Sequence, residues 1–205
     1  MAGCFINELL SKKETVLSGL LLNTSNTDNK IDDLEQDFLK TLKLDSDDYE
    51  VSFIDNYTLT GDAGVDYEVS QAVFVQMSAG FNDFTISPLK YMQNYAYQDC
   101  YRDLRTVLSK EQIEKYEPYF LYIDADYMEK LNKQIKEDES TETTELPDFK
   151  KPEDMKDPVP VLIDLSSFDT ITKYYVTEKD SLVFGIKAST KKLDNTLSFL
   201  DFIAK

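Results

Sequence analysis

Apolar and polar positions alternate along this chain with two different periods, and each change of period marks a new predicted element. An almost continuous apolar run, TVLSGLLLNT at 15–24, is typical of a strand that is buried on both faces. Apolar residues then recur every three or four positions, which predicts an amphipathic helix over 30–43. Single-residue alternation follows and predicts a second strand over 49–59.

The next elements are marked by residues that favour helix ends. A helical pattern over 66–79 stops at Gly80, which we expect to act as its C-cap. A short strand is predicted over 81–87. Ser87 then has the position of an N-cap, and the proline after it suits the first turn of a helix over 88–97.

The middle of the chain carries one more helix signal and one more strand signal. Ser109 and Gln112 have the spacing of a capping box, which predicts a helix over 110–116. The proline that follows ends this helix, and the apolar residues after it predict a strand over 119–123.

Beyond this strand the composition changes. The segment 137–158 carries nine acidic and three basic residues, which is typical of a flexible insertion. Strands are predicted over 159–165 and 181–188, before a last helix capped by Thr190. Strand–helix alternation of this kind predicts one α/β domain over 14–205, with a mostly parallel, doubly wound sheet flanked by helices.

The charge of the chain limits its partners. Asp and Glu number 39 against 22 Lys and Arg, giving a formal net charge of −17, which disfavours nucleic acids and anionic membrane surfaces. Histidine is absent, and Cys4 and Cys100 cannot form a zinc site alone. The chain also lacks the glycine-rich phosphate motifs and the nucleophile elbow. We therefore expect no metal, no cofactor and no enzymatic activity.

One short motif supports an enzymatic alternative. Asp124-Ala-Asp126 has the form of the DxD pair that holds a divalent cation in some glycosyltransferases. In a chain this rich in Asp the pair also arises by chance, and no nucleotide-binding motif accompanies it. A cation-dependent DxD transferase is thus the alternative that this motif leaves open.

The predicted sheet places a candidate ligand site at one edge. Ligands of open α/β sheets bind beyond the carboxyl ends of the strands, and a helix that begins there presents free backbone N–H groups. Here those ends carry Asn23, Thr24 and Ser25 after the first strand and Ser87 after the third. Tyr91 follows on the next helix, in a group of tyrosines that either pack half-buried or stack on sugars.

The N-terminal segment 1–13 stands apart from the predicted domain. Its first ten residues, MAGCFINELL, are apolar but too short to span a bilayer, which takes about 20 residues. They are interpreted as the end of a membrane-anchor helix whose upstream part is missing, or as an N-terminal extension that forms a short amphipathic helix. A third alternative is a lipobox, with Cys4 as the lipidated residue.

Two parts of the sequence resemble a known family. They are MSAGFNDFTI at 77–86 with the Asp-Leu pair at 103–104, and FGIKASTK at 184–191 with LSFLDFI at 197–203. Together they resemble the extracellular solute-binding proteins of ABC transporters, in which a helix ends in Ala-Gly, a short strand carries an Asp and a later helix follows a returning strand.

The resemblance covers 15–123 and 159–204 and implies one lobe of a type II periplasmic-binding-protein-like fold. In that family a second lobe is inserted before the returning strand. The corresponding interval here is about 60 residues, much of it the acidic segment, which is short for a folded lobe. The second lobe is therefore expected to be reduced to a remnant.

The resemblance also implies a function. It suggests a non-enzymatic, cell-surface, bacterial domain that binds a small solute (a sugar or a peptide) weakly or contacts a protein partner. It would be anchored through its N-terminus at the extracellular face of the membrane. A true solute-binding component of an ABC transporter, completed by dimerisation or by a partner, is the alternative.

Overall fold

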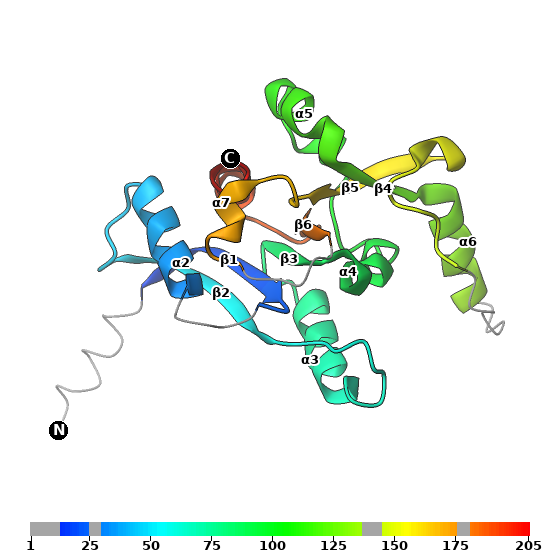
Figure 1. Ribbon diagram of the computed structural model, residues 1–205, viewed down its shortest axis with the longest axis horizontal. Helices are drawn as coiled ribbons and strands as arrows, with labels where there is room; N and C mark the ends of the chain where they lie inside the picture. The colour runs from blue at the N-terminus through cyan, green and yellow to red at the C-terminus, as the bar shows by residue number, and fades with distance from the viewer. Residues whose placement is uncertain (1–12, 25–29, 137–144, 176–180) are drawn as a thin grey trace.

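The computed structural model describes residues 13–24, 30–136, 145–175 and 181–205, which form an α/β fold around one open sheet (Figure 1). Six strands of these residues pair in the order β2-β1-β3-β6-β5-β4. Their bounds are β1 Glu14–Leu22, β2 Tyr49–Tyr57, β3 Phe84–Pro88, β4 Phe120–Asp124, β5 Pro158–Asp164 and β6 Leu182–Ile186. Cys4, Ser25 and nearly all of the predicted N-terminal segment lie outside the described residues.

The helices follow the apolar periodicity of the sequence, with shorter ends than the pattern alone gives. The α-helices are α2 Lys30–Thr41, α3 Tyr67–Ser78, α4 Leu89–Ala96, α5 Lys110–Tyr116, α6 Ala125–Lys136, α7 Asp169–Thr172 and α8 Leu193–Ile203. Short 3₁₀ turns occur at Leu104–Thr106, Glu117–Tyr119 and Pro152–Asp154. Among the described helices, none has the length and apolar character that crossing a bilayer requires.

The sheet is mixed, so the prediction of a mostly parallel sheet is only partly right. β1 pairs in parallel with both β2 and β3, whereas β6 is antiparallel to β3 and to β5, and β4 is antiparallel to β5. The parallel half has full helical crossovers, α2 and α3. In the described part of the connection from β5 to β6, the helix is the four-residue α7, and β6 returns in the direction opposite to β5.

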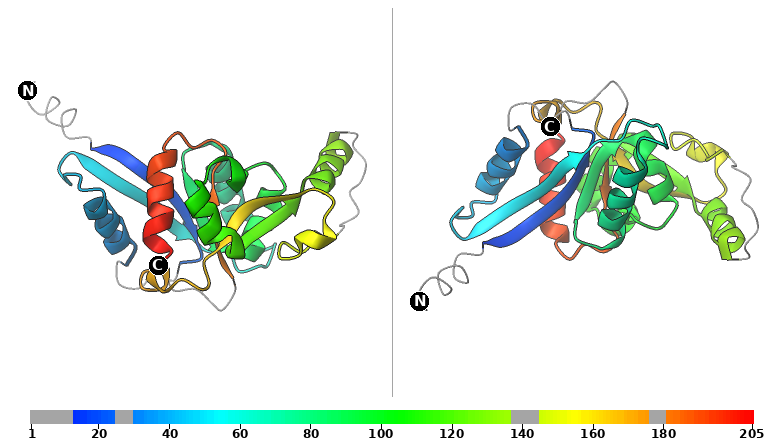
Figure 2. Two further views of the ribbon diagram at one scale, coloured as in Figure 1. Left: turned by 90° about the horizontal axis from the view of Figure 1, so that it is seen from above. Right: turned by 90° about the horizontal axis from the view of Figure 1, so that it is seen from below.

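Helices cover both faces of the sheet, and each face has its own apolar core. Figure 2 shows α8 against one face and α3 and α4 on the other. The α8 side holds a group of aromatic rings, Phe38, Phe53, Phe84, Phe184 and Phe199. The α3 and α4 side is mainly aliphatic. β1 serves both cores, because Leu21 faces one and Leu20 and Leu22 face the other.

The predicted helix ends have mixed outcomes. Ser109 and Gln112 form the capping box at the start of α5, and Gly80 follows α3 with φ +66°, as predicted. The prediction that Ser87 caps the next helix is wrong. β3 continues through Ser87, whose buried hydroxyl donates to the Pro88 carbonyl at 3.0 Å, so α4 begins one residue later.

Thr190 does not cap the last helix either. Lys192 occupies the N-cap position of α8 and makes no side-chain capping bond. The Thr190 hydroxyl instead donates to Asp83 Oδ1 at 2.7 Å and accepts from the Lys192 N–H at 3.1 Å. The Asp83 carboxylate, which is distant in the sequence, therefore binds the Thr190 hydroxyl that the local sequence pattern assigned to the start of the helix.

The described part of the acidic segment, 145–158, is attached to the edge strand β4. The Tyr122 N–H donates to the Phe149 carbonyl at 2.9 Å, and the Phe149 ring is buried. Asp124 accepts the backbone N–H groups of Lys156 and Asp157, both at 3.1 Å. These contacts cover the outer edge of β4, which would otherwise be free to pair with another strand.

Candidate functional site

Asn23 and Thr24 lie at the carboxyl end of β1, where their side chains join the ends of β1 and β2. Asn23 has φ 57°, and its amide bonds both backbone groups of Leu59: Nδ2 donates to the carbonyl at 2.6 Å, and Oδ1 accepts the N–H at 3.1 Å. The Thr24 hydroxyl donates to the Asp55 carbonyl at 2.8 Å. Both side chains thus act as substitutes for sheet hydrogen bonds at this edge.

The other predicted site residues divide into two groups. The Tyr91 hydroxyl donates to the Leu59 carbonyl at 2.7 Å, so Tyr91 and Asn23 meet on the same backbone group. Ser87 is fully buried inside β3, and Ser25 lies outside the described residues. The structure therefore brings Asn23 and Tyr91 together, as the sheet-edge argument expects, with their polar atoms engaged by the protein itself.

The carboxyl end of β1 is also covered by the chain after β5. Tyr175 is buried, and its hydroxyl donates to the Leu22 carbonyl. The neighbouring Tyr174 hydroxyl donates to Asp37 on α2 at 2.9 Å. A ligand at the end of β1 would have to displace these contacts, so an open site has to lie further along the edge.

An open cleft lies beside Tyr91, between α3 and α4, with a volume of about 470 Å³. Residues of α4 line it at helical spacing, because positions four apart share a face of a helix. The lining combines three aromatic rings, three amides, a hydroxyl, one Leu and one Lys: Phe74, Tyr91, Tyr95, Gln71, Asn94, Gln98, Ser70, Leu59 and Lys90.

The electrostatics of this cleft differ from those of the whole chain. Within the part of the chain that the structure describes, no Asp or Glu lines it, although the sequence carries 39 acidic residues. The single charged group of the lining is Lys90, whose Nζ lies 5.0 Å from the centre of the Tyr91 ring. Burial raises the pKa of Tyr95, so its hydroxyl stays protonated near neutral pH.

The position of α3, one wall of the cleft, is set by a buried lysine. Lys187 is 2 % exposed, and its Nζ donates to the Met77 carbonyl in the last turn of α3 at 2.7 Å. The ammonium also lies 5.5 Å from the centre of the Tyr101 ring. Burial lowers the pKa of Lys187, while the helix C-terminus and the aromatic ring favour its charged form.

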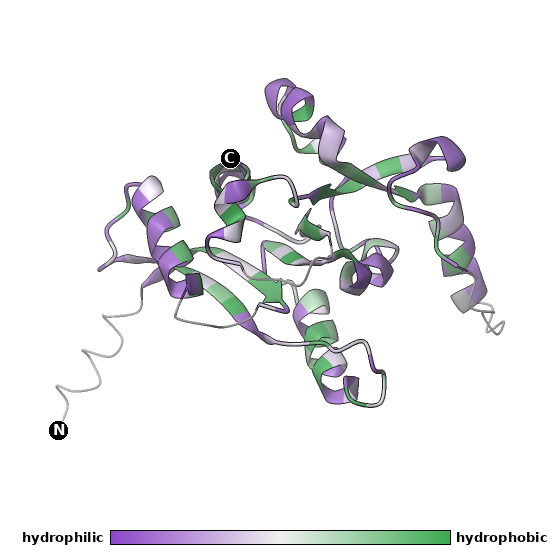
Figure 3. Cartoon of the chain, in the orientation of Figure 1, coloured by the Kyte–Doolittle hydropathy of each residue, from purple (hydrophilic) through white to green (hydrophobic). Residues whose placement is uncertain are grey.

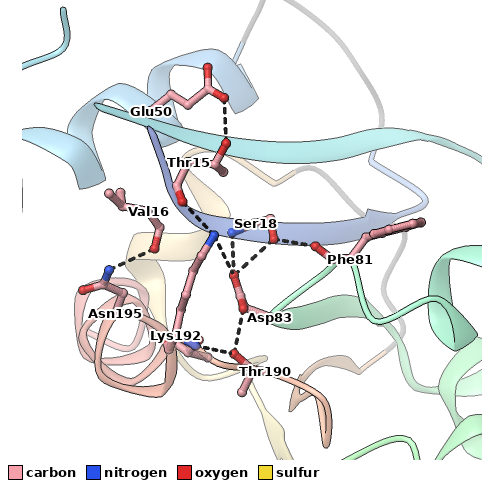
Figure 4. A network of polar contacts seen from close by, with 10 residues as sticks. Thr15, Val16, Ser18, Glu50, Phe81, Asp83, Thr190, Lys192 and Asn195 are labelled. Atoms are coloured by element: carbon pink, nitrogen blue, oxygen red, sulfur yellow. Dashed lines mark hydrogen bonds and ion pairs between the residues drawn. The ribbon is translucent and has the colours of Figure 1, made fainter. Parts of the chain in front are cut away.

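A carboxylate network next to this wall holds the strands together (Figure 4). Asp83 precedes β3 and is buried. Its Oδ2 accepts the Ser18 N–H at 2.9 Å and the Ser18 hydroxyl at 3.1 Å, and its Oδ1 accepts the Thr190 hydroxyl. Lys192 Nζ lies 4.0 Å from Oδ2. One carboxylate thus joins β1, the start of β3 and the chain entering α8. These contacts give Asp83 a role in holding the fold together.

The Asp124-Ala-Asp126 pair is engaged in protein contacts. Asp124 Oδ1 accepts the Asp126 N–H at the start of α6, in addition to the two N–H groups of the acidic segment. Asp126 pairs with Lys130 at 2.6 Å and lies 3.5 Å from Lys156. These hydrogen bonds lower the pKa of both carboxyls. Among the described residues, no group of three His, Cys, Asp or Glu is placed to hold a metal ion.

The side chains that line the α3–α4 cleft are of types that can form hydrogen bonds and apolar contacts with a ligand. Each amide can donate and accept hydrogen bonds, and aromatic rings offer flat apolar faces to a ligand. Gln71, Phe74, Asn94 and Gln98 were not identified from the sequence. Their signal was present as amides and rings at spacings of three and four on consecutive helices, but the relative placement of α3 and α4 was needed to combine them.

No protein-family model, no curated protein and no solved structure gives a significant match to this chain.

A second hollow, of about 400 Å³, lies between α2 and the start of β2 and contains the half-buried Glu35. Its carboxylate accepts the Phe53 N–H on the outer edge of β2. Burial raises the pKa of Glu35 to about 7, with smaller contributions from the acidic groups of Asp32, Asp55 and Glu50. Glu35 is therefore a group whose charge changes near neutral pH.

We predict that Glu35 makes folding less favourable as the pH rises. The pKa of Glu35 is higher in the folded protein than the ordinary value of 4.5. Its contribution to the free energy of unfolding is therefore fully present below pH 4.5 and is lost as the pH rises through about 7. After allowance for solvent screening, the change is about 1–2 kcal/mol. Urea unfolding of the wild type and Glu35→Gln from pH 4 to 8 measures it.

The substituted amide can still accept the Phe53 N–H, so the comparison isolates the charge. The wild type is expected to lose stability relative to Glu35→Gln across this pH range. A difference between the two proteins that is constant from pH 4 to 8 would contradict the assignment.

Proposed function

We propose that this chain is a non-enzymatic binding domain that holds a small, uncharged, hydroxyl- or amide-rich solute weakly in the α3–α4 cleft. The observation that carries the proposal is the lining: three amides and three aromatic rings, with no carboxylate from the described residues of an otherwise acidic chain. Sugars and short peptides present both hydrogen-bonding groups and apolar faces, which such a lining complements.

The cleft is open, which limits the expected affinity. A shallow site buries only part of a ligand and gains less free energy than an enclosed pocket does. We therefore expect dissociation constants on the order of 1 mM, which corresponds to about −4 kcal/mol. The walls are helices packed on the sheet, so little of this free energy is spent on ordering the site.

The arrangement of the strands supports a relationship to one lobe of the type II solute-binding fold. The segment expected as the returning strand, at 184–191, contributes to β6, which lies antiparallel between β3 and β5. We propose on this basis, together with the sequence resemblance, a solute-binding-protein-like domain. Its proposed location, at the extracellular face of a bacterial membrane through the segment 1–13, rests on sequence alone.

Isothermal titration calorimetry with maltotriose, cellotriose, chitotriose and the blocked peptide acetyl-Ala-Ala-Ala-amide, which has no charged ends, tests the proposal. At least one of these is expected to bind with a dissociation constant near 1 mM. The double variant Gln71→Ala/Asn94→Ala should bind about tenfold more weakly, because it loses two hydrogen-bonding groups. Both residues are exposed, so the fold should be unaffected.

Gln134→Ala, on an exposed position of α6, is the matched control and should bind as the wild type does. If the Gln71/Asn94 double variant binds the solute as tightly as the wild type does, the solute does not bind in the α3–α4 cleft. If no compound of the panel binds at about 10 mM, tenfold above the expected dissociation constant, the proposed class of solute is wrong.

A further inference from the structure

Helix α3 is apolar on two opposite sides. Val73 and Met77 are buried in the core below it. On the outer side, Tyr67 is 66 % exposed, Phe74 50 % and Val75 55 %. The hydropathy colouring of Figure 3 shows green segments along this helix, which lies at the periphery of the fold in Figure 1. Large apolar side chains that are exposed together on one element often mark a contact site.

The exposed apolar residues of α3 lie on its outer side. Phe74 and Val75 come seven and eight residues after Tyr67, which places them two turns further along the helix. Val65 precedes the helix and is 67 % exposed, and Phe81 follows it and is 69 % exposed. We call these five residues the α3 apolar surface; they are the large apolar side chains that are strongly exposed among the described residues.

The size of this surface is informative. The exposed fractions, with about 200 Å² for an aromatic side chain, give roughly 500 Å² of apolar area. That is near the upper end for the largest apolar patch of a monomer, and such patches are often functional. A standard interface buries about 800 Å² on each side, so a partner has to extend onto the polar surface around it.

Two exposed acidic residues, Asp62 and Glu68, lie at the N-terminal end of α3, next to Val65 and Tyr67 in the chain. The segment 44–89, which contains β2, α3 and β3, carries nine acidic residues and no Lys or Arg. Within α3 the only charged residue is Glu68, in the first turn. Depletion of charge at the centre with charge around it is typical of a protein interface. A second copy of this chain would bring two acidic segments together, whereas a basic partner would complement them.

We propose that the α3 apolar surface docks a protein partner through an amphipathic helix whose apolar face is bordered by Lys and Arg. The partner's apolar side chains would cover Tyr67, Val75 and Phe81, and its basic residues would lie against the acidic residues at the start of α3, Asp62 and Glu68. The proposal goes beyond solute binding. Tyr67, Val75 and Phe81 do not line the cleft, whereas Phe74 belongs to both the cleft and the α3 apolar surface.

The test uses a labelled 18-residue synthetic helix with Leu on one face and Lys on the other, measured by fluorescence anisotropy. The wild type is expected to bind it at least tenfold more tightly than Tyr67→Ser/Val75→Ser/Phe81→Ser does. This triple variant keeps the net charge, so the comparison removes non-specific attraction between the acidic protein and the peptide. Gln134→Ser on α6 is the matched control and should bind as the wild type does.

Two further comparisons complete the test. A matched peptide with Glu in place of Lys should bind at least tenfold more weakly. The variant Asn94→Ala/Gln98→Ala, which changes the cleft away from α3, should keep its binding to the Lys peptide. A circular dichroism melt of the triple variant should match the wild type within about 2 °C, because the substituted side chains are exposed.

Three results would overturn the proposal. The first is equal binding of the Lys peptide by the wild type and the triple variant. The second is self-association of the wild type that the triple variant loses in analytical ultracentrifugation, which would make a second copy the occupant. The third is binding to phosphatidylcholine vesicles that the triple variant loses, which would make a lipid surface the occupant.

Discussion

Replacing Gly19 by Ala is expected to lower the free energy of unfolding by about 3 kcal/mol. Gly19 lies in β1, an interior strand between β2 and β3, and a Cβ built there would come within 2.2 Å of Phe84 Cζ. The Phe84 ring cannot move aside easily, because its centre lies between 4.7 and 5.4 Å from those of Phe53, Phe184 and Phe199. Urea unfolding followed by far-ultraviolet circular dichroism measures the loss.

Gly64→Ala is the matched control for this substitution. Gly64 is exposed, does not have positive φ, and its Cβ would meet only Asp62 Oδ1, at 3.3 Å. Its effect should stay within about 0.5 kcal/mol. A Gly19→Ala protein that unfolds within about 1 kcal/mol of the wild type would show that the aromatic core is not packed as described.

Replacing Asp83 by Ala is expected to cost a similar amount, about 3 kcal/mol. The substitution leaves the buried Thr190 hydroxyl without its acceptor and removes the side-chain acceptor of the Ser18 N–H. Because the carboxylate joins three segments, its loss should also reduce the cooperativity of unfolding. Thr190→Val removes one of the Asp83 hydrogen bonds and the weaker one that the hydroxyl accepts from the Lys192 N–H, and should cost about 1–2 kcal/mol.

Asp47→Ala, at an exposed position of the same acidic chain, provides the control for a change of net charge. It should leave the free energy of unfolding within about 0.5 kcal/mol of the wild type. If Asp83→Ala and Asp47→Ala unfold at the same denaturant concentration, Asp83 does not join the strands in the way that its contacts indicate.

The sequence predicted those elements that local interactions determine. The apolar run of β1, the helical spacing of α2 and the capping box of α5 depend on neighbours in the chain, and all three are present. The direction of β6 was missed, because it depends on a connection with very little helix. Ser87 and Thr190 were misassigned because each has the local signature of a helix cap. Strand pairing determines the role of Ser87, and the contact with Asp83 determines that of Thr190.

The candidate site was also predicted only in part, because some of its contacts join segments that are distant in the sequence. The sheet-edge rule correctly placed Asn23 and Tyr91 near each other, at the carboxyl end of the parallel strands. It could not show that the Leu59 backbone takes up their polar atoms, or that Tyr175 covers the end of β1, since both contacts join segments far apart in the sequence. The α3–α4 cleft likewise exists only once two consecutive helices are packed on the sheet.

The most direct test of the central claim is a ¹⁵N–¹H correlation spectrum during titration with neutral trisaccharides and acetyl-Ala-Ala-Ala-amide. The side-chain amide signals of Gln71, Asn94 and Gln98 should shift together and saturate in the millimolar range. Those of Asn195 and Gln112 should stay in place, because these amides donate to Val16 and Asp201 outside the cleft. Unchanged cleft amides, or shifts centred on other residues, would contradict the account.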